Sequence, residues 1–507
     1  MIKSVLIANR GEIAIRIART AKRMGIHTYA IRTTKEPEAV YLSTADTVID
    51  FPETDSNISE FLNIDMLIGL AGKYGIESLH PGYGYLSENA ELAERCRQAG
   101  IIFIGPSPEI IKLMGDKVAA KEIAARSGVP ILGASQKAIG NIDEAVTIAH
   151  KLGYPIIIKA VSGGGGRGMR IVRTPNELAP SYKIATAEAQ VAFNDPSVFI
   201  EKYLENPKHI EFQIVADNYG NIIHLGEREC SIQRKHQKIM EEAPSPALDE
   251  RLRKKMAKAA VSLAQTAGYQ SLGTVEFLLD RQKHFYFMEM NTRVQVEHPV
   301  TEMNTRIQVE HPITEEITGL DLVELQFNIA AGRKLPIRQS QVHLNGWSIE
   351  CRINAENVQY GFSPSMGTIR KLRLPQGNHI RIETGIAPGS EITPFFDSMV
   401  AKLIVTGDNR EQAIERALSA LERFHVKGIR TTIPFCKSVL HNEIYRKGDF
   451  DTSFIETQLT SIIWREPHEE LLAALFAIYT YTHENTPEIG PDTPIDPWVL
   501  NKRIRNL

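Results

Sequence analysis

A run of glycines is the feature of this sequence best suited to holding phosphates. SGGGGRGMRIV follows the apolar stretch YPIIIKA, which we expect to be a buried strand ending near Lys159. Consecutive glycines leave backbone N–H groups free to fold over phosphate oxygens. Glycine runs also form flexible linkers, and this one is neither a Walker loop nor GxGxxG. Its place between two predicted strands favours a phosphate lid.

A pair of acids supplies a second chemical signal. Glu276 and Glu289 lie in two apolar stretches, TVEFLLD and HFYFMEMN, that are separated by a short polar turn. A hairpin would bring the two carboxylates together at one end. With the amide of Asn291 they suit Mg²⁺, which prefers oxygen ligands and shares them with substrate phosphates. Exposed acids at the ends of strands often bind no metal. The predicted phosphate-binding glycine run is therefore the reason to prefer a metal site here.

Nicotinamide dinucleotides are disfavoured by the first strand-to-helix turn. This turn, ANRGEIA, has one glycine, so a pyrophosphate would lack the close backbone approach that it needs.

Length and composition bound the class of protein. The 507 residues allow two to four domains, and the net charge of −3 predicts no attraction to nucleic acid or to an anionic membrane. No apolar run is long enough to span a bilayer, and Arg10, Glu12 and Arg16 interrupt the apolar N-terminus before a signal peptide could form. Four cysteines without a CxxC pair predict neither a disulfide framework nor a zinc site: Cys96, Cys230, Cys351 and Cys436. We expect a soluble protein of the cytoplasm.

The elements that position these residues begin with a βαβ unit. KSVLIAN predicts a strand, EIAIRIARTAKRMG a helix that Gly25 ends, and IHTYAI the next strand. MGDKVAAKEIAARSG predicts one helix. The stretches VFIEKYL, HIEFQIVAD and NIIHLGE, with the hairpin that carries Glu276 and Glu289, predict a large antiparallel sheet. A linker, AGRKLPIRQSQVHLNG, precedes an α+β region, and the tail holds one amphipathic helix, EELLAALFAIYTY.

Several long motifs resemble the biotin carboxylase family of ATP-grasp enzymes. They are NRGEIA, HPGYGYLSENA, MGDK, KAVSGGGGRGMR, EKYLENPKHIE, ERECSIQRKHQK, EMNTRVQVEHPVTE, ECRINAE and FFDSMVAKLI, and the resemblance covers residues 1 to about 455. It implies a fold of class α/β plus α+β in five parts. These are an N-terminal Rossmann-like domain (1–114), an ATP-grasp domain with a mobile glycine-rich lid (115–330), a linker (331–345), a C-terminal biotin carboxylase domain (346–455) and a helical, Pro-rich tail (456–507).

The resemblance also implies roles for individual residues. It places ATP on Lys117, Lys159, Gly163, Gly164, Gly165, Gly166, Glu201, Lys202, Leu204, His209, Gln233 and His236. It places Mg²⁺ or Mn²⁺ on Glu276, Glu289 and Asn291, and it places bicarbonate and biotin on Lys238, Arg293, Gln295, Val296, Glu297 and Arg352. Glu297 would act as general base on bicarbonate, while the planar forks of Arg293 and Arg352 match that anion. His80 and Tyr83 we expect only to order a turn, and Cys230 to be a buried thiol.

The expected reaction loads biotin with carbon dioxide. Bicarbonate would attack the γ-phosphate of ATP to give carboxyphosphate, and a closed lid would exclude water. The sequence contains no AMKM-like biotinylation tetrapeptide, so the resemblance implies that the biotin carboxyl carrier and the carboxyltransferase are separate chains. It also implies a homodimer. The chain looks most like the biotin carboxylase subunit of two-subunit pyruvate carboxylases or of acetyl-CoA carboxylase, and the final acceptor, pyruvate or an acyl-CoA, stays open.

A tandem repeat interrupts the most chemical segment. Residues 289–301 and 302–314 are the same thirteen residues with two Val→Ile changes, whereas the family has this block once. Either copy can fill the site: the first would supply Glu289, Arg293 and Glu297, and the second would supply Glu302, Arg306 and Glu310. We expect the first copy, because Glu289 is continuous with its strand. The alternatives are another ATP-grasp ligase, such as half of a carbamoyl-phosphate synthetase, and a catalytically impaired nucleotide-binding subunit.

Overall fold

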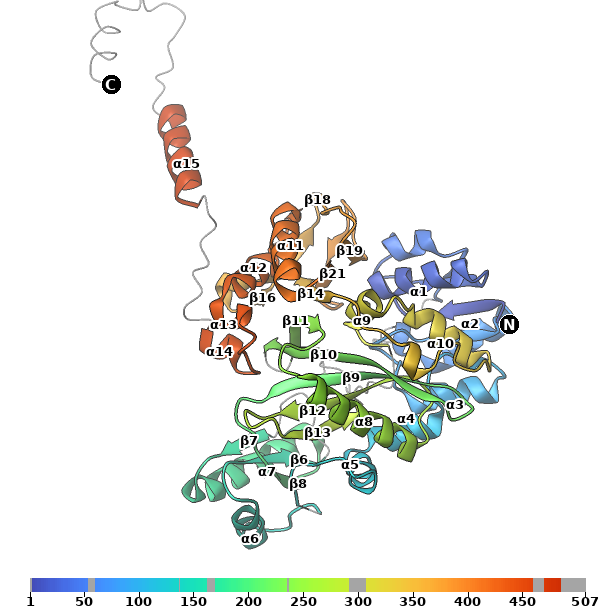
Figure 1. Ribbon diagram of the computed structural model, residues 1–507. Coiled ribbons are helices and arrows are strands. Elements are labelled where there is room, and N and C mark those ends of the chain that lie inside the picture. Colours follow the sequence, from blue (N-terminus) through green and yellow to red (C-terminus); the bar gives the residue numbers. More distant parts are fainter. Residues whose placement is uncertain are drawn as a thin grey trace, which may run out of the picture. The chain divides into compact units, whose positions relative to one another are not determined.

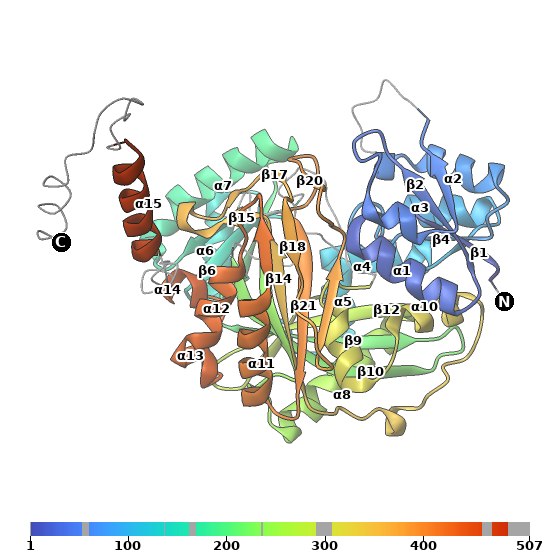
Figure 2. The same cartoon turned by 90° about the horizontal axis from the view of Figure 1, so that it is seen from above.

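The computed structural model describes residues 2–52, 60–135, 137–161, 169–234, 237–290, 307–458 and 469–484. The chain divides into two compact units, residues 1–462 and 463–507. The first unit contains every element of the candidate site and is shown from two directions in Figures 1 and 2.

The N-terminal region is a parallel sheet with helical connections. Its strand order is β3-β2-β1-β4-β5, and the predicted βαβ unit is confirmed. Gly25 follows the first helix with φ of +73°, a conformation that glycine adopts without steric cost. The elements are β1 (Ser4–Ile7), α1 (Gly11–Arg23), β2 (His27–Arg32), η1 (Val40–Thr44), β3 (Thr47–Asp50), η2 (Glu60–Leu62), α2 (Ile64–Lys73), β4 (Ser78–His80), α3 (Ala90–Gln98) and β5 (Ile102–Phe103).

The helix predicted from MGDKVAAKEIAARSG is two helices in the structure. Helix α4 (Pro108–Gly115) ends before Asp116, and α5 (Lys117–Arg126) begins after it. Asp116 has extended backbone angles, and its carboxylate accepts the N–H of Ala119 at 3.0 Å. An aspartate in this position caps a new helix, and this explains the break.

A small antiparallel sheet flanks the glycine run. Its order is β7-β6-β8, from β6 (Ile156–Ala160), β7 (Met169–Val172) and β8 (Val198–Lys202). Helices α6 (Ile142–Leu152) and α7 (Leu178–Phe193) pack on it through buried residues such as Ala149 and Ala189 (Figure 1, teal); η3 (Pro175–Glu177) precedes α7. The assignment of VFIEKYL to the large sheet was therefore wrong: β8 pairs with the short strand β6 instead.

The large sheet has eight strands in the order β13-β12-β9-β10-β11-β14-β21-β19. It continues across the predicted linker, because β11 pairs antiparallel with β14. The strands are β9 (Lys208–Ala216), β10 (Ile222–Arg234), β11 (Gln237–Ala243), β12 (Ser271–Leu279), β13 (Phe285–Met290), β14 (Trp347–Asn354), β19 (Ile380–Thr384) and β21 (Met399–Gly407). Helix α8 (Glu250–Ala267) covers β9 and β10, and the predicted hairpin of β12 and β13 is present.

The remaining elements complete this unit and the tail. Helix α11 lies along β21 and β14 (Figure 2). The elements are α9 (His311–Thr318), α10 (Leu322–Ala330), η4 (Gln339–Gln341), β15 (Glu356–Asn357), η5 (Val358–Tyr360), β16 (Ser363–Pro364), β17 (Gly367–Thr368), β18 (Lys371–Arg373), β20 (Glu391–Ile392), α11 (Arg410–Arg423), β22 (His425–Lys427), α12 (Ile433–His441), α13 (Glu443–Arg446) and α14 (Phe454–Gln458). The second unit contains α15 (Glu469–Glu484), whose large apolar side chains at positions 475–481 are exposed. In the described part of the chain, no helix is long and apolar enough to cross a membrane.

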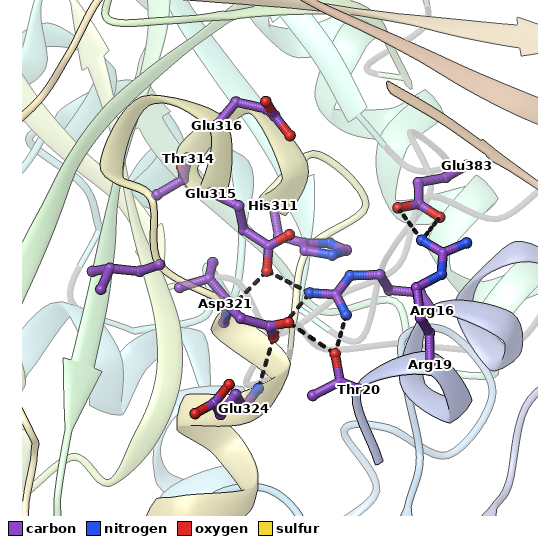
Figure 3. A network of polar contacts seen from close by, with 12 residues as sticks. Arg16, Arg19, Thr20, His311, Thr314, Glu315, Glu316, Asp321, Glu324 and Glu383 are labelled. Atoms are coloured by element: carbon purple, nitrogen blue, oxygen red, sulfur yellow. Dashed lines mark hydrogen bonds and ion pairs between the residues drawn. The ribbon is translucent and has the colours of Figure 1, made fainter. Parts of the chain in front are cut away.

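A polar network joins the N-terminal helix α1 to α9 and α10 (Figure 3). Arg16 is almost fully buried, and its guanidinium lies 2.7 Å from Glu315 and 2.9 Å from Asp321. Asp321 also accepts hydrogen bonds from Thr20 at 2.8 Å and from Arg23 at 2.6 Å. Because α9 begins within the second copy of the repeat (302–314), this network fixes the chain on the carboxyl side of the candidate site.

We predict that Asp321→Asn destabilises the fold in a pH-dependent way. Burial alone would raise the pKa of Asp321, but the charge of Arg16 and the hydrogen bond from Arg23 lower it from 3.8 to about 2. A lowered pKa stabilises the fold above the unfolded value and ceases to do so as the pH falls through the folded value. The variant should lose about 2 kcal/mol of unfolding free energy at pH 7, because asparagine still caps α10 but carries no charge.

Thermal midpoints measured by circular dichroism at several pH values test this prediction. The gap between variant and parent should narrow between pH 4 and pH 2. Asp50→Asn is the control, because the ion pair of Asp50 with Arg32 is exposed and should be worth less than about 1 kcal/mol. Equal losses in both variants, or a gap that does not change with pH, would contradict the prediction.

Candidate active site

Lys238 lies at the centre of a buried cluster of charges on the large sheet. Its ammonium nitrogen is 2.7 Å from a carboxylate oxygen of Glu211, 3.3 Å from Glu276 and 2.5 Å from Glu310. The sheet register places Glu211 of β9 directly opposite Glu276 of β12, so both carboxylates reach the same region. Burial alone would lower the pKa of Lys238, but the surrounding carboxylates raise it well above its ordinary value. The lysine is therefore charged.

Arg228 supports the cluster from the adjacent strand β10. Its guanidinium is fully buried and donates hydrogen bonds to Glu211, to the side-chain oxygen of Gln213 at 2.9 Å and to Thr314 at 2.9 Å. Burial raises the pKa of Glu211, while Arg228 and Lys238 act in the opposite direction. Arg228 thus holds the carboxylate of Glu211 in place and connects the large sheet to helix α9.

Glu310 lies between two cations just before α9. One of its oxygens is 2.5 Å from Lys238, and the other accepts a hydrogen bond from Arg352 of β14 at 2.9 Å. Arg352 also forms an ion pair with Glu241 of β11. Burial alone would raise the pKa of Glu310, but the charges of Lys238, Arg352 and Arg228 hold it well below its ordinary value. Glu310 is therefore an ionised carboxylate at neutral pH.

Glu276 and its neighbours fit a divalent metal ion. The hairpin register places Glu289 directly opposite Glu276. Glu276 accepts a hydrogen bond from His209 at 2.7 Å, and burial, which alone would raise its pKa, is outweighed by Lys238 and His209. The side-chain atoms of His209, Glu211 and Glu276 lie within 4.8 Å of one another. Two carboxylates and an imidazole this close together can hold a divalent ion, and Mg²⁺ prefers the carboxylate oxygens.

A second charged group lies on the small sheet beside the glycine run. Lys159 of β6 is 2.6 Å from Glu201 of β8, and Lys121 of α5 forms an ion pair with the same carboxylate. Lys202 donates to the carbonyl oxygens of Gly153 at 3.0 Å and Tyr154 at 2.9 Å. Two cations on one carboxylate leave a net positive site, which suits the phosphates of a nucleotide.

The structure brings together part of the predicted site. His209, Lys238, Glu276 and Arg352 share one cluster on the large sheet, and Gln233 is opposite Lys238 in the β10–β11 register. Lys159, Glu201 and Lys202 are on the small sheet, and Leu204 follows β8. Outside the described residues lie Gly163, Gly164, Gly165, Gly166, His236, Asn291, Arg293, Gln295, Val296 and Glu297, and the side chains of Lys117 and Glu289 are likewise not described.

Three residues of the cluster have no role predicted from the sequence: Glu211, Arg228 and Glu241. A signal was present, because His209, Glu211 and Gln213 alternate with apolar residues in HIEFQIVAD, and such alternation places three polar side chains on one face of a strand. Two other residues behave as expected. His80 is buried and accepts the N–H of Gly82 at 3.0 Å, a turn-ordering role, and Cys230 is a buried thiol.

Comparison with known protein families gives three consecutive matches. The N-terminal domain of biotin carboxylase matches residues 1–111, and the C-terminal domain of biotin carboxylase matches residues 350–457. Between them, the ATP-binding domain described from the carbamoyl-phosphate synthase L chain matches residues 116–303 and 301–338. The chain belongs to the biotin carboxylase family. The flanking domains exclude the alternative of a carbamoyl-phosphate synthetase half.

Relatives and solved structures agree with this membership. Biotin carboxylase 1 of Bacillus subtilis is 47% identical over 90% of this chain and 99% of that protein. A pyruvate carboxylase subunit of Methanothermobacter thermautotrophicus is 45% identical over 90% of each chain. The biotin carboxylase domain dimer of Hydrogenobacter thermophilus 2-oxoglutarate carboxylase, solved with MgADP, ADP and bicarbonate, superposes with a TM-score of 0.84 at 45% identity, covering 92% of this chain and all of that one. The resemblance inferred from the motifs is confirmed.

Proposed function

We propose that this biotin carboxylase uses ATP and bicarbonate to carboxylate biotin on a separate carrier protein, through carboxyphosphate. The observation that carries the proposal is the buried cluster of Lys238, Glu276, Glu310 and Arg352. Glu310 is an ionised acid, Lys238 and Arg352 are cations held in place, and Glu276 is a carboxylate suited to binding a metal ion. A relative with 45% identity was solved with MgADP and bicarbonate, which are a product and a substrate of this reaction. The catalytically impaired alternative is not favoured, because these charges are paired and in place.

The first step requires a base and an anion site. Bicarbonate is a weak nucleophile, so removal of its proton by a positioned carboxylate favours attack on the γ-phosphate. An ionised glutamate of the repeat accepts the proton, and Arg352 and Lys238 bind the anion. As these cations transfer hydrogen bonds from the glutamate to bicarbonate, the pKa of the glutamate rises and proton transfer becomes easier.

The nucleotide would bind between the small sheet (β7-β6-β8) and the large eight-stranded sheet. Among the residues that the structure describes, its contacts would be Lys159, Glu201, Lys202, Leu204, His209 and Gln233. We propose that Lys117, His236 and the lid of Gly163, Gly164, Gly165 and Gly166 complete the nucleotide site. Glu276 and Glu289, with Asn291, would hold Mg²⁺ or Mn²⁺, which neutralises charge on the transferred phosphoryl group. Arg352 then stabilises the enolate of biotin or the departing phosphate.

Partners and location follow from the proposed reaction. We propose a homodimer in the cytoplasm that works with a biotin carboxyl carrier and a carboxyltransferase subunit. The relatives leave the acceptor open, since they include one chain of a pyruvate carboxylase and the small subunit of a 2-oxoglutarate carboxylase. We also propose the domain boundaries given above, 1–114, 115–330, 331–345, 346–455 and 456–507.

Release of ADP by the purified chain tests the proposed function. With ATP, Mg²⁺ and bicarbonate, we expect free biotin or a biotinylated carrier domain to stimulate ADP release, and omission of bicarbonate to abolish the stimulation. ATP binding without any stimulation by biotin or carrier would contradict the proposed carboxylation.

A further inference from the structure

We infer that the second copy of the repeat supplies the residues for bicarbonate, Gln308 and Glu310, while the first copy supplies Glu289, which lies opposite Glu276 in the hairpin. The active site is therefore a hybrid of both copies. This inference rests on the proposed function and deepens it, because it decides which of two nearly identical segments does the chemistry. It replaces the expectation that Glu297 of the first copy is the base.

The first observation is the ion pairing of Glu310. It corresponds in the repeat to Glu297, thirteen residues earlier. Glu310 is 1% exposed and contacts both Lys238 and Arg352, the two cations that the anion site requires. A second glutamate in the same place would add an uncompensated buried charge, which is costly. The position of the base is thus already taken.

The second observation is that the chain is anchored on both sides of Glu310. The carbonyl oxygen of Val309 accepts a hydrogen bond from the buried Lys402 at 2.9 Å, and Thr314 accepts one from Arg228 at 2.9 Å. Helix α9 begins at His311 and runs into Glu315, which contacts Arg16. The last four residues of the second copy, 311–314, are the start of α9, so the helix fixes that copy in the site.

The third observation concerns the two residues by which the copies differ. Ile307 and Ile313 replace Val294 and Val300 of the first copy, and both isoleucines are fully buried in apolar clusters. Each additional methylene adds buried apolar surface at these positions. The side chains that distinguish the second copy are therefore part of the core.

The fourth observation is an unsatisfied donor beside the glutamate. Gln308 is 3% exposed, and its amide nitrogen has no hydrogen-bond partner among the described residues. A buried donor of this kind is normally paired, and an oxygen of a small anion would satisfy it. Gln308 and Glu310 come from the same copy, so a single segment offers both a donor for bicarbonate and a base.

The connection between the two halves of the site explains how a hybrid is possible. Glu289 is on β13 opposite Glu276, and so belongs to the first copy. Glu310 follows it by 21 residues, whereas Glu297 follows it by eight. The thirteen extra residues therefore fall in the sequence between Met290 and Ile307. Closing a longer loop costs only about 0.6 kcal/mol of free energy for each doubling of its length. The family match also splits within the repeat, at residues 301–303.

Matched single variants test the inference. We expect Glu310→Gln to lower the kcat of biotin-dependent ADP release by about 10²-fold or more, the usual contribution of a general base, with ATP binding retained. Glu297→Gln should change kcat by less than about twofold, because the inference places that residue outside the chemistry. A large loss only in Glu297→Gln, or equal effects of the two changes, would overturn the inference.

A stability measurement keeps the inference testable whatever the activity. Ile307→Ala should lower the melting temperature by roughly 5 °C or more, whereas Val294→Ala should leave it nearly unchanged. The reverse order, or equal shifts, would overturn the placement of the second copy. If the parent chain shows no biotin-dependent ADP release, the proposed function fails, and these melting temperatures still decide which copy is built into the core.

Discussion

Replacing Lys238 by glutamine is expected to abolish most of the activity and to lower the stability of the fold. The ammonium group compensates Glu211, Glu276 and Glu310, all of which are buried. Removing one partner of a buried ion pair typically costs about 3–5 kcal/mol, because the other charge stays buried. The same change removes a fixed charge from the reaction site, so kcat should fall by about 10²-fold to 10³-fold. Thermal unfolding and biotin-dependent ADP release measure the two effects.

Lys254→Gln is the matched control for this variant. Lys254 pairs with Glu250 on the exposed face of α8, so its loss should change neither kcat nor the melting temperature appreciably. If Lys238→Gln melted with the parent chain and kept its turnover, the buried cluster would not have the energetic role that we assign to it.

Replacing Arg352 is expected to have its largest effect on turnover. Arg352 is held on β14 and contacts Glu310 and Glu241, so its position is fixed before any substrate binds. Preorganised cations lower the barrier where negative charge develops, and the loss of one such group costs about 10²-fold to 10³-fold in kcat. We expect this loss for Arg352→Gln, with the dissociation constant of ATP changed by less than about twofold.

Arg352→Lys separates charge from geometry at the same position. Lysine keeps the charge but not the planar fork, so it should recover only a small part of the lost turnover. Arg373→Gln, at an exposed position of β18, serves as the control and should behave like the parent chain. Equal activities of Arg352→Gln and the parent, or a loss confined to ATP binding, would contradict the assigned role.

Much of the fold could be predicted because its local signals agree with its tertiary structure. The first βαβ unit and the hairpin that pairs Glu276 with Glu289 were predicted from apolar spacing and turns. The strand Val198–Lys202 was assigned to the wrong sheet, because apolar strands carry no mark of their partners. The break at Asp116 was missed, because the helical pattern is similar on both sides of it.

The sequence predicted which types of residue form the site better than it predicted which copy of the repeat supplies them. Lys238, Glu276 and Arg352 were recognised from motifs, and the structure brings them together. The first copy, with Glu297, was expected to fill the site, but the local signals of the two copies are nearly identical and give no ground to prefer it over Glu310. The copies differ in their tertiary contacts: α9 is held by Arg16 through Glu315 and by Arg228 through Thr314. Both partners are far away in the sequence, so the repeat alone does not predict these contacts.

The most direct test compares the full chain with one from which residues 291–303 have been deleted. This deletion retains Glu289 and Glu310 and restores a spacing of eight residues between them. Because both chains assemble the same residues, we predict biotin-stimulated ADP release by both, with kcat values within about tenfold, or about 1.4 kcal/mol in the barrier. Stimulated release by the shortened chain alone would show that the duplication inactivates the enzyme and would contradict our account of a working hybrid site.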